Sequence, residues 1–201
     1  ALLEAPDLVA RRLRTFPTLE LRPAEQTDGR TVTFPIRPPE KIERDLARLG
    51  SLGLRENTLL VFVGDNGTGR GTRSMMGDKL VIGGKGTTTE FGMHVPLIAN
   101  WPGKVAAGKV HADLVDSTDF LPTVCEAAGV NLPAALKIDG RSFLPQVRGE
   151  AGRPRDWYYS WYAPYEVVEA EFAATRDFKL YRNGRFHDLR HDLEEQQPLK
   201  P

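Results

Sequence analysis

The chain has 201 residues, and its 27 lysines and arginines balance its 27 aspartates and glutamates, so the formal net charge is zero. Apolar residues make up 40% and charged residues 27%, a balance typical of globular rather than disordered proteins. The even charge argues against nucleic acids and anionic membranes as partners. The single cysteine, Cys125, excludes an internal disulfide framework.

The N-terminal part gives few firm predictions. No apolar run in the chain approaches the roughly 18 residues that cross a bilayer, and no signal peptide is visible after Ala1. Because a truncated chain would lack such a segment, targeting stays open. Residues 1–37 stay unassigned, although apolar residues from Leu8 to Phe16 have helical spacing and residues 31–34 resemble a brief strand.

Two elements in series indicate the fold class. From Glu40 to Leu49, apolar residues recur every three or four positions, which predicts a helix that stops near Gly50. The unbroken apolar run 59–63, ended by Gly64, predicts a strand buried on both faces. A helix that leads into a buried strand is typical of an α/β fold with a mainly parallel sheet.

Further elements follow along the chain. Residues 95–101 predict a second buried strand, and Ser117 or Thr118 can cap a helix that ends at Gly129. From Trp157 aromatic and polar residues alternate, and Asn183-Gly184 is a hairpin signal, so the tail predicts a small antiparallel sheet.

These patterns suggest three parts. Residues 1–37 form the unassigned N-terminal segment, residues 38–152 form the larger part, and residues 153–201 form the small C-terminal subdomain.

Asp65 and Asn66 follow the first predicted strand directly. Ligands of open α/β sheets bind beyond the carboxyl ends of the strands. A carboxylate and a carboxamide oxygen suit Ca²⁺ or Mg²⁺. A plain turn is the simpler interpretation of Asp-Asn-Gly when it is considered alone.

Two nucleotide motifs are excluded. A dinucleotide fingerprint would need a third glycine where Thr72 follows Gly67 and Gly69, and a Walker A loop would need Ser or Thr where Gly86 follows Lys85.

A second glycine-rich loop, residues 83–90, carries Lys85. A lysine between glycines can point into a cleft and bind an oxyanion, although most loop lysines are solvated. His94 lies just beyond it, either as a cleft residue or as an ordinary histidine at the end of a strand.

Together these segments resemble the sulfatase family of the alkaline phosphatase superfamily. The resemblance rests on four landmarks in the family's order, and they cover residues 40–197: Leu54–Gly67, Gly84–Gly103, Asp116–Thr123, and the pair Arg176–Leu180 with His187–Leu189. It implies part of a mainly parallel, alkaline-phosphatase-like sheet with flanking helices, followed by a small antiparallel sheet. It also implies a periplasmic or extracellular enzyme.

The resemblance implies the chemistry as well. Sulfatases hydrolyse sulfate esters with a formylglycine nucleophile, made from Cys or Ser in a Cys/Ser-x-Pro/Ala-x-Arg motif. Asp65 and Asn66 correspond to ligands of the family's Ca²⁺, with Mg²⁺ as the second choice, and Lys85 corresponds to its sulfate-contacting lysine. His94 falls where many relatives carry Arg and is expected to contact the substrate. The implied substrate is a small sulfate ester or a sulfated carbohydrate.

The nucleophile is missing from this sequence. Cys125 has neither Pro nor Arg at the required offsets and lies on an apolar helical stripe, so we interpret it as a small core residue. We therefore expect a sulfatase fragment that is inactive alone and self-associates through exposed sheet edges. Two alternatives stay open: a phosphodiesterase or phosphonate hydrolase of the same superfamily, and a non-catalytic binding protein derived from a sulfatase.

Overall fold

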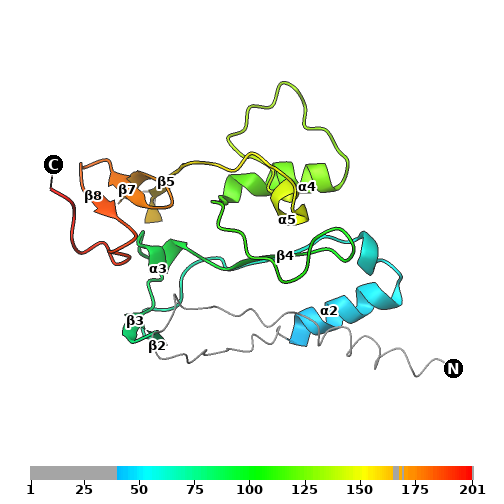
Figure 1. The fold of residues 1–201 in the computed structure, drawn as a ribbon, viewed down its shortest axis with the longest axis horizontal. Helices are drawn as coiled ribbons and strands as arrows, with labels where there is room; N and C mark the ends of the chain where they lie inside the picture. The colour runs from blue at the N-terminus through cyan, green and yellow to red at the C-terminus, as the bar shows by residue number, and fades with distance from the viewer. Residues whose placement is uncertain (1–39, 165–167, 169, 201) are drawn as a thin grey trace.

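The computed structural model describes residues 40–200, except 165–167 and 169 (Figure 1). The patterns noted in residues 1–37 lie outside the described part. The helices are α2 (Glu40–Ser51), α3 (Glu90–Met93), α4 (Phe120–Ala127) and α5 (Leu144–Arg148), with 3-10 turns η1 (Arg55–Asn57) and η2 (Ser117–Asp119). The strands are β1 (Leu60–Val63), β2 (Arg73–Met76), β3 (Lys79–Ile82), β4 (Leu97–Asn100), β5 (Tyr158–Tyr162), β6 (Ala170–Ala174), β7 (Phe178–Tyr181) and β8 (Phe186–Asp188).

The predicted helix and the two predicted strands are present as α2, β1 and β4, but the strands pair antiparallel, with Val63 opposite Leu97. No parallel pair occurs among the described strands, so the mainly parallel sheet is not seen in them. The Gly64 N–H donates to the Pro96 carbonyl, 3.1 Å away, which extends this antiparallel pairing by one residue beyond β1. The described part is mixed α/β with small antiparallel sheets.

The prediction that β1 is buried on both faces is wrong for the described residues. Its first three side chains are half-buried, and Val63 is 44% exposed. The reason is that β1 has a single strand neighbour, β4, so its other edge and much of one face lack described partners.

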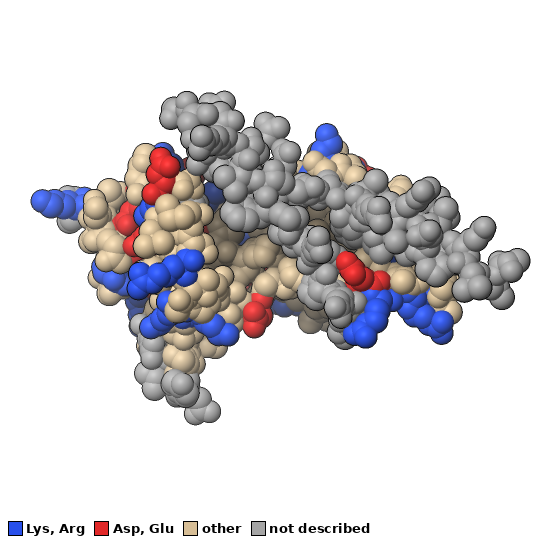
Figure 2. Space-filling model, turned by 90° about the horizontal axis from the view of Figure 1, so that it is seen from below, with Lys and Arg blue, Asp and Glu red and all other residues tan. Residues whose placement is uncertain are grey.

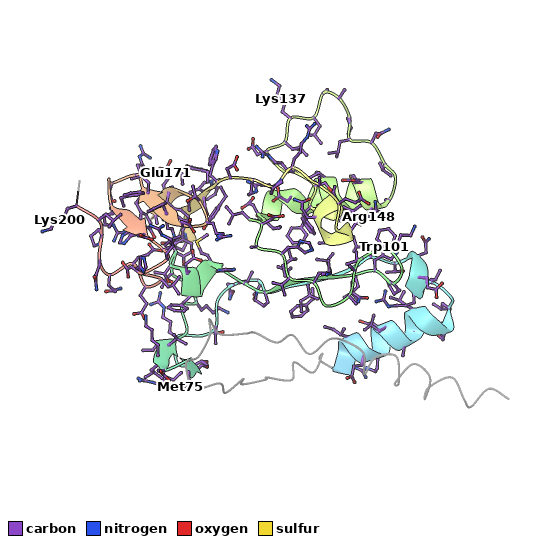
Figure 3. The ribbon with its side chains drawn as sticks, in the orientation of Figure 1. Met75, Trp101, Lys137, Arg148, Glu171 and Lys200 are labelled. Atoms are coloured by element: carbon purple, nitrogen blue, oxygen red, sulfur yellow. The ribbon has the colours of Figure 1, made fainter. Side chains whose placement is uncertain are left out.

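Trp101 anchors the chain where β4 ends. Its ring is buried and its indole N–H donates to the Glu56 carbonyl, 2.8 Å away in η1. The Arg148 guanidinium of α5 lies 5.6 Å from the ring centroid, and Figure 3 shows the two side chains side by side. This residue therefore joins α5 and η1 to the end of β4.

A hairpin that the sequence analysis did not predict joins the first glycine-rich loop to the second. Strands β2 and β3 pair antiparallel around Gly77, which has φ of +62°. Met75 and Leu80 are about half exposed, and Figure 3 places Met75 at the far end of the hairpin. The hairpin therefore projects from the rest of the molecule.

Helix α4 begins one or two residues later than predicted, after η2. Asp116 is the N-cap residue, and Asp119 completes a capping box with it. Gly129 has φ of +68°, which confirms the predicted stop. Cys125 is a free, half-buried thiol on α4, so it is less buried than a core residue.

The C-terminal tail forms the predicted antiparallel sheet, in the order β5-β6-β7-β8. Gly184, with φ of +85°, forms the expected hairpin between β7 and β8. On the inner face Phe172, Ala174 and Tyr181 form a core cluster, against which Met93 of α3 packs. This contact brings the sheet to the segment that carries Lys85.

The surface agrees with the even charge. Figure 2 shows Lys and Arg side chains in separate groups toward the two ends of the visible face, with acidic side chains among and between them. Within the described ranges, no helix combines the length and apolarity that a bilayer span needs.

Candidate functional site

Two glycine-rich loops lie against each other beyond β1. The first is the 64–71 loop, which contains Asp65 and Asn66, and the second is the lysine loop, residues 83–89. The Lys85 N–H donates to the Thr68 carbonyl at 3.0 Å, and the Gly67 N–H donates to the Gly92 carbonyl of α3 at 2.8 Å. The structure thus joins the two segments that the sequence analysis selected separately.

Glycine is required where these backbones meet. A Cβ atom on Gly67 would lie 1.9 Å from the Phe91 carbonyl oxygen, and one on Gly92 would lie 2.2 Å from the Thr87 carbonyl oxygen. Both obstacles are backbone atoms, so no side-chain rotation can relieve them.

Gly67→Ala is therefore expected to lower the free energy of unfolding by about 1–3 kcal/mol, the usual cost of overpacking. Gly69→Ala in the same loop is the matched control, because nothing lies within 4 Å of its added Cβ. Urea unfolding of both variants measures the difference. Equal midpoints would contradict the close backbone approach.

The Asp65–Asn66 pair can offer two oxygen ligands. Asp65 is exposed, and within the described part its carboxylate makes no hydrogen bond or ion pair. The Asn66 amide nitrogen donates to the Gly67 carbonyl at 3.2 Å, which leaves the side-chain oxygen free to bind a cation. The donor chemistry fits Ca²⁺, but the described residues contain no group of three or more His, Cys, Asp or Glu suited to a metal. The pair is at most part of a metal site.

Arg70 holds the backbone around Lys85. Its Nε donates to the Lys85 carbonyl and its terminal nitrogen donates to the Gly86 carbonyl, both at 2.9 Å. The Lys85 side chain itself is exposed. The lysine loop therefore has a fixed backbone and a free ammonium group, as an oxyanion-binding lysine needs.

A buried polar network reaches the lysine loop from the C-terminal sheet. Lys179 is fully buried, and its ammonium group donates to the Thr88 carbonyl and to Glu195, whose carboxylate oxygen lies 2.8 Å away. Burial lowers the pKa of Lys179, and the hydrogen bond to Glu195 opposes that shift. The hydroxyl of Tyr181 lies 2.9 Å from the hydroxyl of Thr88, and burial, followed by its hydrogen bond to Glu195, raises the pKa of Tyr181.

The sequence analysis missed these three residues, Lys179, Tyr181 and Glu195. It included Lys179 in a family landmark, Arg176–Leu180, without giving it a role. A lysine in a strand of alternating residues gives no local signal that it is buried.

A pocket of about 270 Å³ adjoins the lysine loop. Residues 86–89 form one wall, and Tyr162, Tyr181 and Arg185 of the C-terminal sheet are among the residues of the others. A larger pocket of about 660 Å³ near α4 and α5 contains no residue of either glycine-rich loop. The smaller pocket is therefore the one that belongs to the candidate site.

His94 lies at the C-terminal end of α3, outside this pocket. Its side chain is 80% exposed, and Nδ1 lies 3.1 Å from a carboxylate oxygen of Glu90. That hydrogen bond, only partly offset by desolvation, raises the pKa of His94 above its ordinary value of 6.5.

The raised pKa predicts a pH dependence. A base whose pKa is higher in the folded state than in the unfolded state stabilises the fold at pH values below its unfolded pKa. This contribution to the free energy of unfolding is lost as the pH rises through the folded-state pKa. The unfolding midpoint of the wild type should thus fall slightly from pH 6 to pH 8 relative to that of His94→Gln. Urea titrations at both pH values measure this, and an NMR titration midpoint at or below 6.5 would contradict it.

Comparisons with known proteins agree on one family. Residues 85–198 match the family described as N-sulphoglucosamine sulphohydrolase, C-terminal. Human (Homo sapiens) arylsulfatase A is 37% identical over 138 residues, which are 68% of this chain and 27% of that protein. Mouse (Mus musculus) steryl-sulfatase is 38% identical over 118 residues, 56% of this chain and 19% of that protein.

Solved structures give the same result. A putative sulfatase from Bacteroides thetaiotaomicron is 26% identical with a TM-score of 0.60, over 80% of this chain and 35% of that one. A second neighbour was solved in complex with its substrate, D-glucosamine-2-N,6-O-disulfate. It is 26% identical with a TM-score of 0.60, and the match covers 79% of this chain and 33% of that one.

The chain thus spans about a fifth to a third of the length of these relatives. The family match covers more than half of the chain and includes Lys85 and the whole C-terminal sheet. The chain belongs to the sulfatase family.

Proposed function

We propose that this chain supplies the later part of the active site of a sulfatase, an enzyme that hydrolyses sulfate esters. One observation carries the proposal. In a member of the sulfatase family, the loop with Asp65 and Asn66 and the loop with Lys85 are joined by a backbone hydrogen bond, from Lys85 N–H to Thr68, 3.0 Å long.

In this proposal Asp65 and Asn66 hold one side of a Ca²⁺ ion, with Mg²⁺ as the second choice. Such a cation would neutralise charge on the sulfate oxygens as the ester bond breaks. Ca²⁺ takes six to eight oxygen ligands, so the pair supplies only part of the coordination shell. The exposed carboxylate of Asp65 and the free amide oxygen of Asn66 support this assignment.

Lys85 is the proposed catalytic residue of this chain. Its ammonium group binds an outer sulfate oxygen and stabilises the negative charge that accumulates there in the transition state. His94 is proposed to bind the substrate, because its imidazole is exposed and its hydrogen bond to Glu90 favours the protonated form, which attracts an anion. The pocket beside residues 86–89 would hold the part of the substrate next to the sulfate group.

The nucleophile is proposed to lie outside these 201 residues, because they contain no Cys/Ser-x-Pro/Ala-x-Arg segment. The chain alone should therefore not turn over a sulfate ester. Clear Ca²⁺-dependent hydrolysis of 4-nitrophenyl sulfate by these 201 residues alone would contradict this part of the proposal.

The function itself is tested on the product of the entire reading frame that contains this chain. We expect Ca²⁺-dependent hydrolysis of 4-nitrophenyl sulfate or glucosamine 6-sulfate. Lys85→Ala should lower kcat roughly 10²- to 10³-fold, as when a single donor to a developing oxyanion is removed. Lys104→Ala is the matched control, because Lys104 is exposed and lies against Trp101, outside the site.

The same assay separates the alternatives. Arylsulfatase A, steryl-sulfatase and the putative sulfatase reported above carry that name, so a phosphodiesterase, a phosphonate hydrolase and a non-catalytic binding protein gain no support. Hydrolysis of bis(4-nitrophenyl) phosphate without hydrolysis of any sulfate ester would overturn the sulfatase proposal. The two sulfate substrates also distinguish an aryl sulfate preference from a carbohydrate sulfate preference.

We also propose that β1 and β4 belong to a larger, mainly parallel sheet in the whole protein. The half-exposed β1 and its open edge support this. In the isolated chain such an edge should promote self-association. Light scattering of the purified chain is expected to give a mass above that of a monomer, and a monodisperse monomer would contradict this.

A further inference from the structure

The lysine loop is held from two sides. Arg70 binds the carbonyls of Lys85 and Gly86 on one side. On the other side, the contacts come from Lys179 and Tyr181, about 90 residues further along the chain. Both are on β7, two residues apart, so their side chains point to the same face of the sheet.

The contact from Lys179 requires the desolvation of a buried ammonium group. Its side chain is completely buried, and the ammonium group lies 4.1 Å from the centroid of the Phe172 ring. Burying an ion pair such as Lys179–Glu195 adds little net stability, since apolar residues of similar size pack as well without the desolvation cost. A role beyond stability is therefore indicated. The only group outside the C-terminal segment that this ammonium binds, among the described residues, is the Thr88 carbonyl.

Tyr181 determines which groups donate and which accept in the network. Its hydroxyl donates to Glu195, so its oxygen accepts the hydrogen bond from the Thr88 hydroxyl. Thr88 is thus bound twice, through its carbonyl by Lys179 and through its side chain by Tyr181. The Thr87 N–H donates to the Gly84 carbonyl at 2.9 Å and closes a turn. Lys85, three residues before Thr88, is the second residue of this turn.

Glu195, which accepts hydrogen bonds in this network, has an unfavourable backbone conformation. Its φ of +56° is the one positive value among the described non-glycine residues. Such residues persist when their surroundings fix them, and they gather at functional sites. Here the surroundings are the bonds from Lys179 and Tyr181 to the Glu195 carboxylate.

We propose that Lys179 and Tyr181 are positioning residues, which fix Thr88 and thereby hold Lys85 in the orientation that binds the sulfate group. The inference rests on the proposed function for the role of Lys85, whereas the restraint of the lysine loop can be measured without any substrate. Neither residue contacts the substrate's reacting atoms in this proposal. They act through the backbone of residues 85–88.

The first test is hydrogen exchange of the lysine loop. The variants are Lys179→Met, which keeps an unbranched side chain one atom shorter and without the ammonium group, and Tyr181→Phe, which removes only the hydroxyl. The Lys85 and Thr87 amides are hydrogen-bonded and should exchange roughly 2- to 10-fold faster, the effect of losing one hydrogen bond. Amides in β5–β8 should keep their protection in Tyr181→Phe. Lys179→Met also leaves the buried Glu195 carboxylate without its partner, so it should lower protection in the sheet as well. Thr88→Ser, which retains both acceptor and hydroxyl, should behave as the wild type.

Lys79→Met is the matched control. Lys79 binds Glu194, the neighbour of Glu195, at 2.9 Å, but both side chains are about half exposed and neither contacts Thr88. It removes a lysine–glutamate pair that joins β3 to the residue beside Glu195, without touching the network. Its loop exchange should equal that of the wild type.

The second test is turnover by the product of the whole reading frame. Tyr181→Phe and Lys179→Met should lower kcat for 4-nitrophenyl sulfate roughly 10- to 100-fold, with a smaller change in KM. Unchanged loop exchange in both variants overturns the inference. So does unchanged kcat, or a loss of protection in Tyr181→Phe that is spread evenly over β5–β8, which indicates a purely structural role. If the wild type hydrolyses no sulfate ester, the proposed function fails while the exchange data still decide whether the network restrains the loop.

Discussion

Asp119→Ala is expected to lower the free energy of unfolding by about 3–5 kcal/mol, the cost of breaking a buried ion pair from one side. Asp119 is 2% exposed, and its carboxylate accepts hydrogen bonds from Arg155 and from the backbone N–H groups of Asp116 and Arg141. Removing it leaves the guanidinium and two N–H groups without their acceptor. The Asp119 carboxylate raises the pKa of Arg155, which remains charged and would be left unpaired.

The matched comparison is Asp116→Ala. This residue forms the outer half of the same capping box and accepts from Thr118 near the surface, so its removal should cost about 1 kcal/mol. Urea unfolding followed by tryptophan fluorescence gives both values. Equal losses in the two variants would contradict a buried ion pair at Asp119.

Phe172→Ala should cost about 3–5 kcal/mol, because it removes the central ring of the C-terminal cluster and leaves a cavity. The ring is 2% exposed and lies 6.0 Å from that of Tyr158 and 5.3 Å from that of Tyr181, centroid to centroid. The ammonium of Lys179 rests on the same ring. The lysine loop should therefore lose protection from hydrogen exchange along with the sheet, unlike in Tyr181→Phe.

Leu180→Ala is the control for this prediction. Leu180 is on β7, but it points to the opposite face and is 50% exposed, so its loss should stay within about 0.5 kcal/mol. Fluorescence of Trp157 and Trp161 at β5 reports the unfolding of the sheet. A cost below 1 kcal/mol for Phe172→Ala would contradict the packing described here.

Local patterns predicted the elements whose causes are local. The helical spacing from Glu40 to Leu49 became α2, the apolar run before Gly64 became β1, and the aromatic tail became an antiparallel sheet. The direction of β4 relative to β1 has no such local cause, because it depends on the path of the chain through residues 64–96. The β2–β3 hairpin was missed although Gly77-Asp78 is a two-residue turn signal, since residues 73–76 contain no β-branched or aromatic side chain that would mark a strand.

The residues of the candidate site also fall into those that local patterns predicted and those that they did not. Asp65, Asn66 and Lys85 were selected because glycines and strand ends mark their loops, and the structure brings these loops together. The network behind Lys85 was hidden because β7 inverts the usual pattern. Alternation predicts that Leu180 is buried and Lys179 is exposed, but Leu180 is half exposed and Lys179 is buried. The partners that reverse this order come from other parts of the chain.

The bond between Lys179 and the Thr88 carbonyl spans 91 positions of sequence. Contacts this distant form late, because the intervening chain must first be closed into a loop. During synthesis, the ribosome releases Glu195 more than a hundred residues after Lys85. On the proposed arrangement, a nascent chain would carry its anion-binding lysine on an unrestrained loop until the residues around Glu195 had emerged from the ribosome and folded. Emergence of this distant segment would then act as the signal that switches on the chemistry.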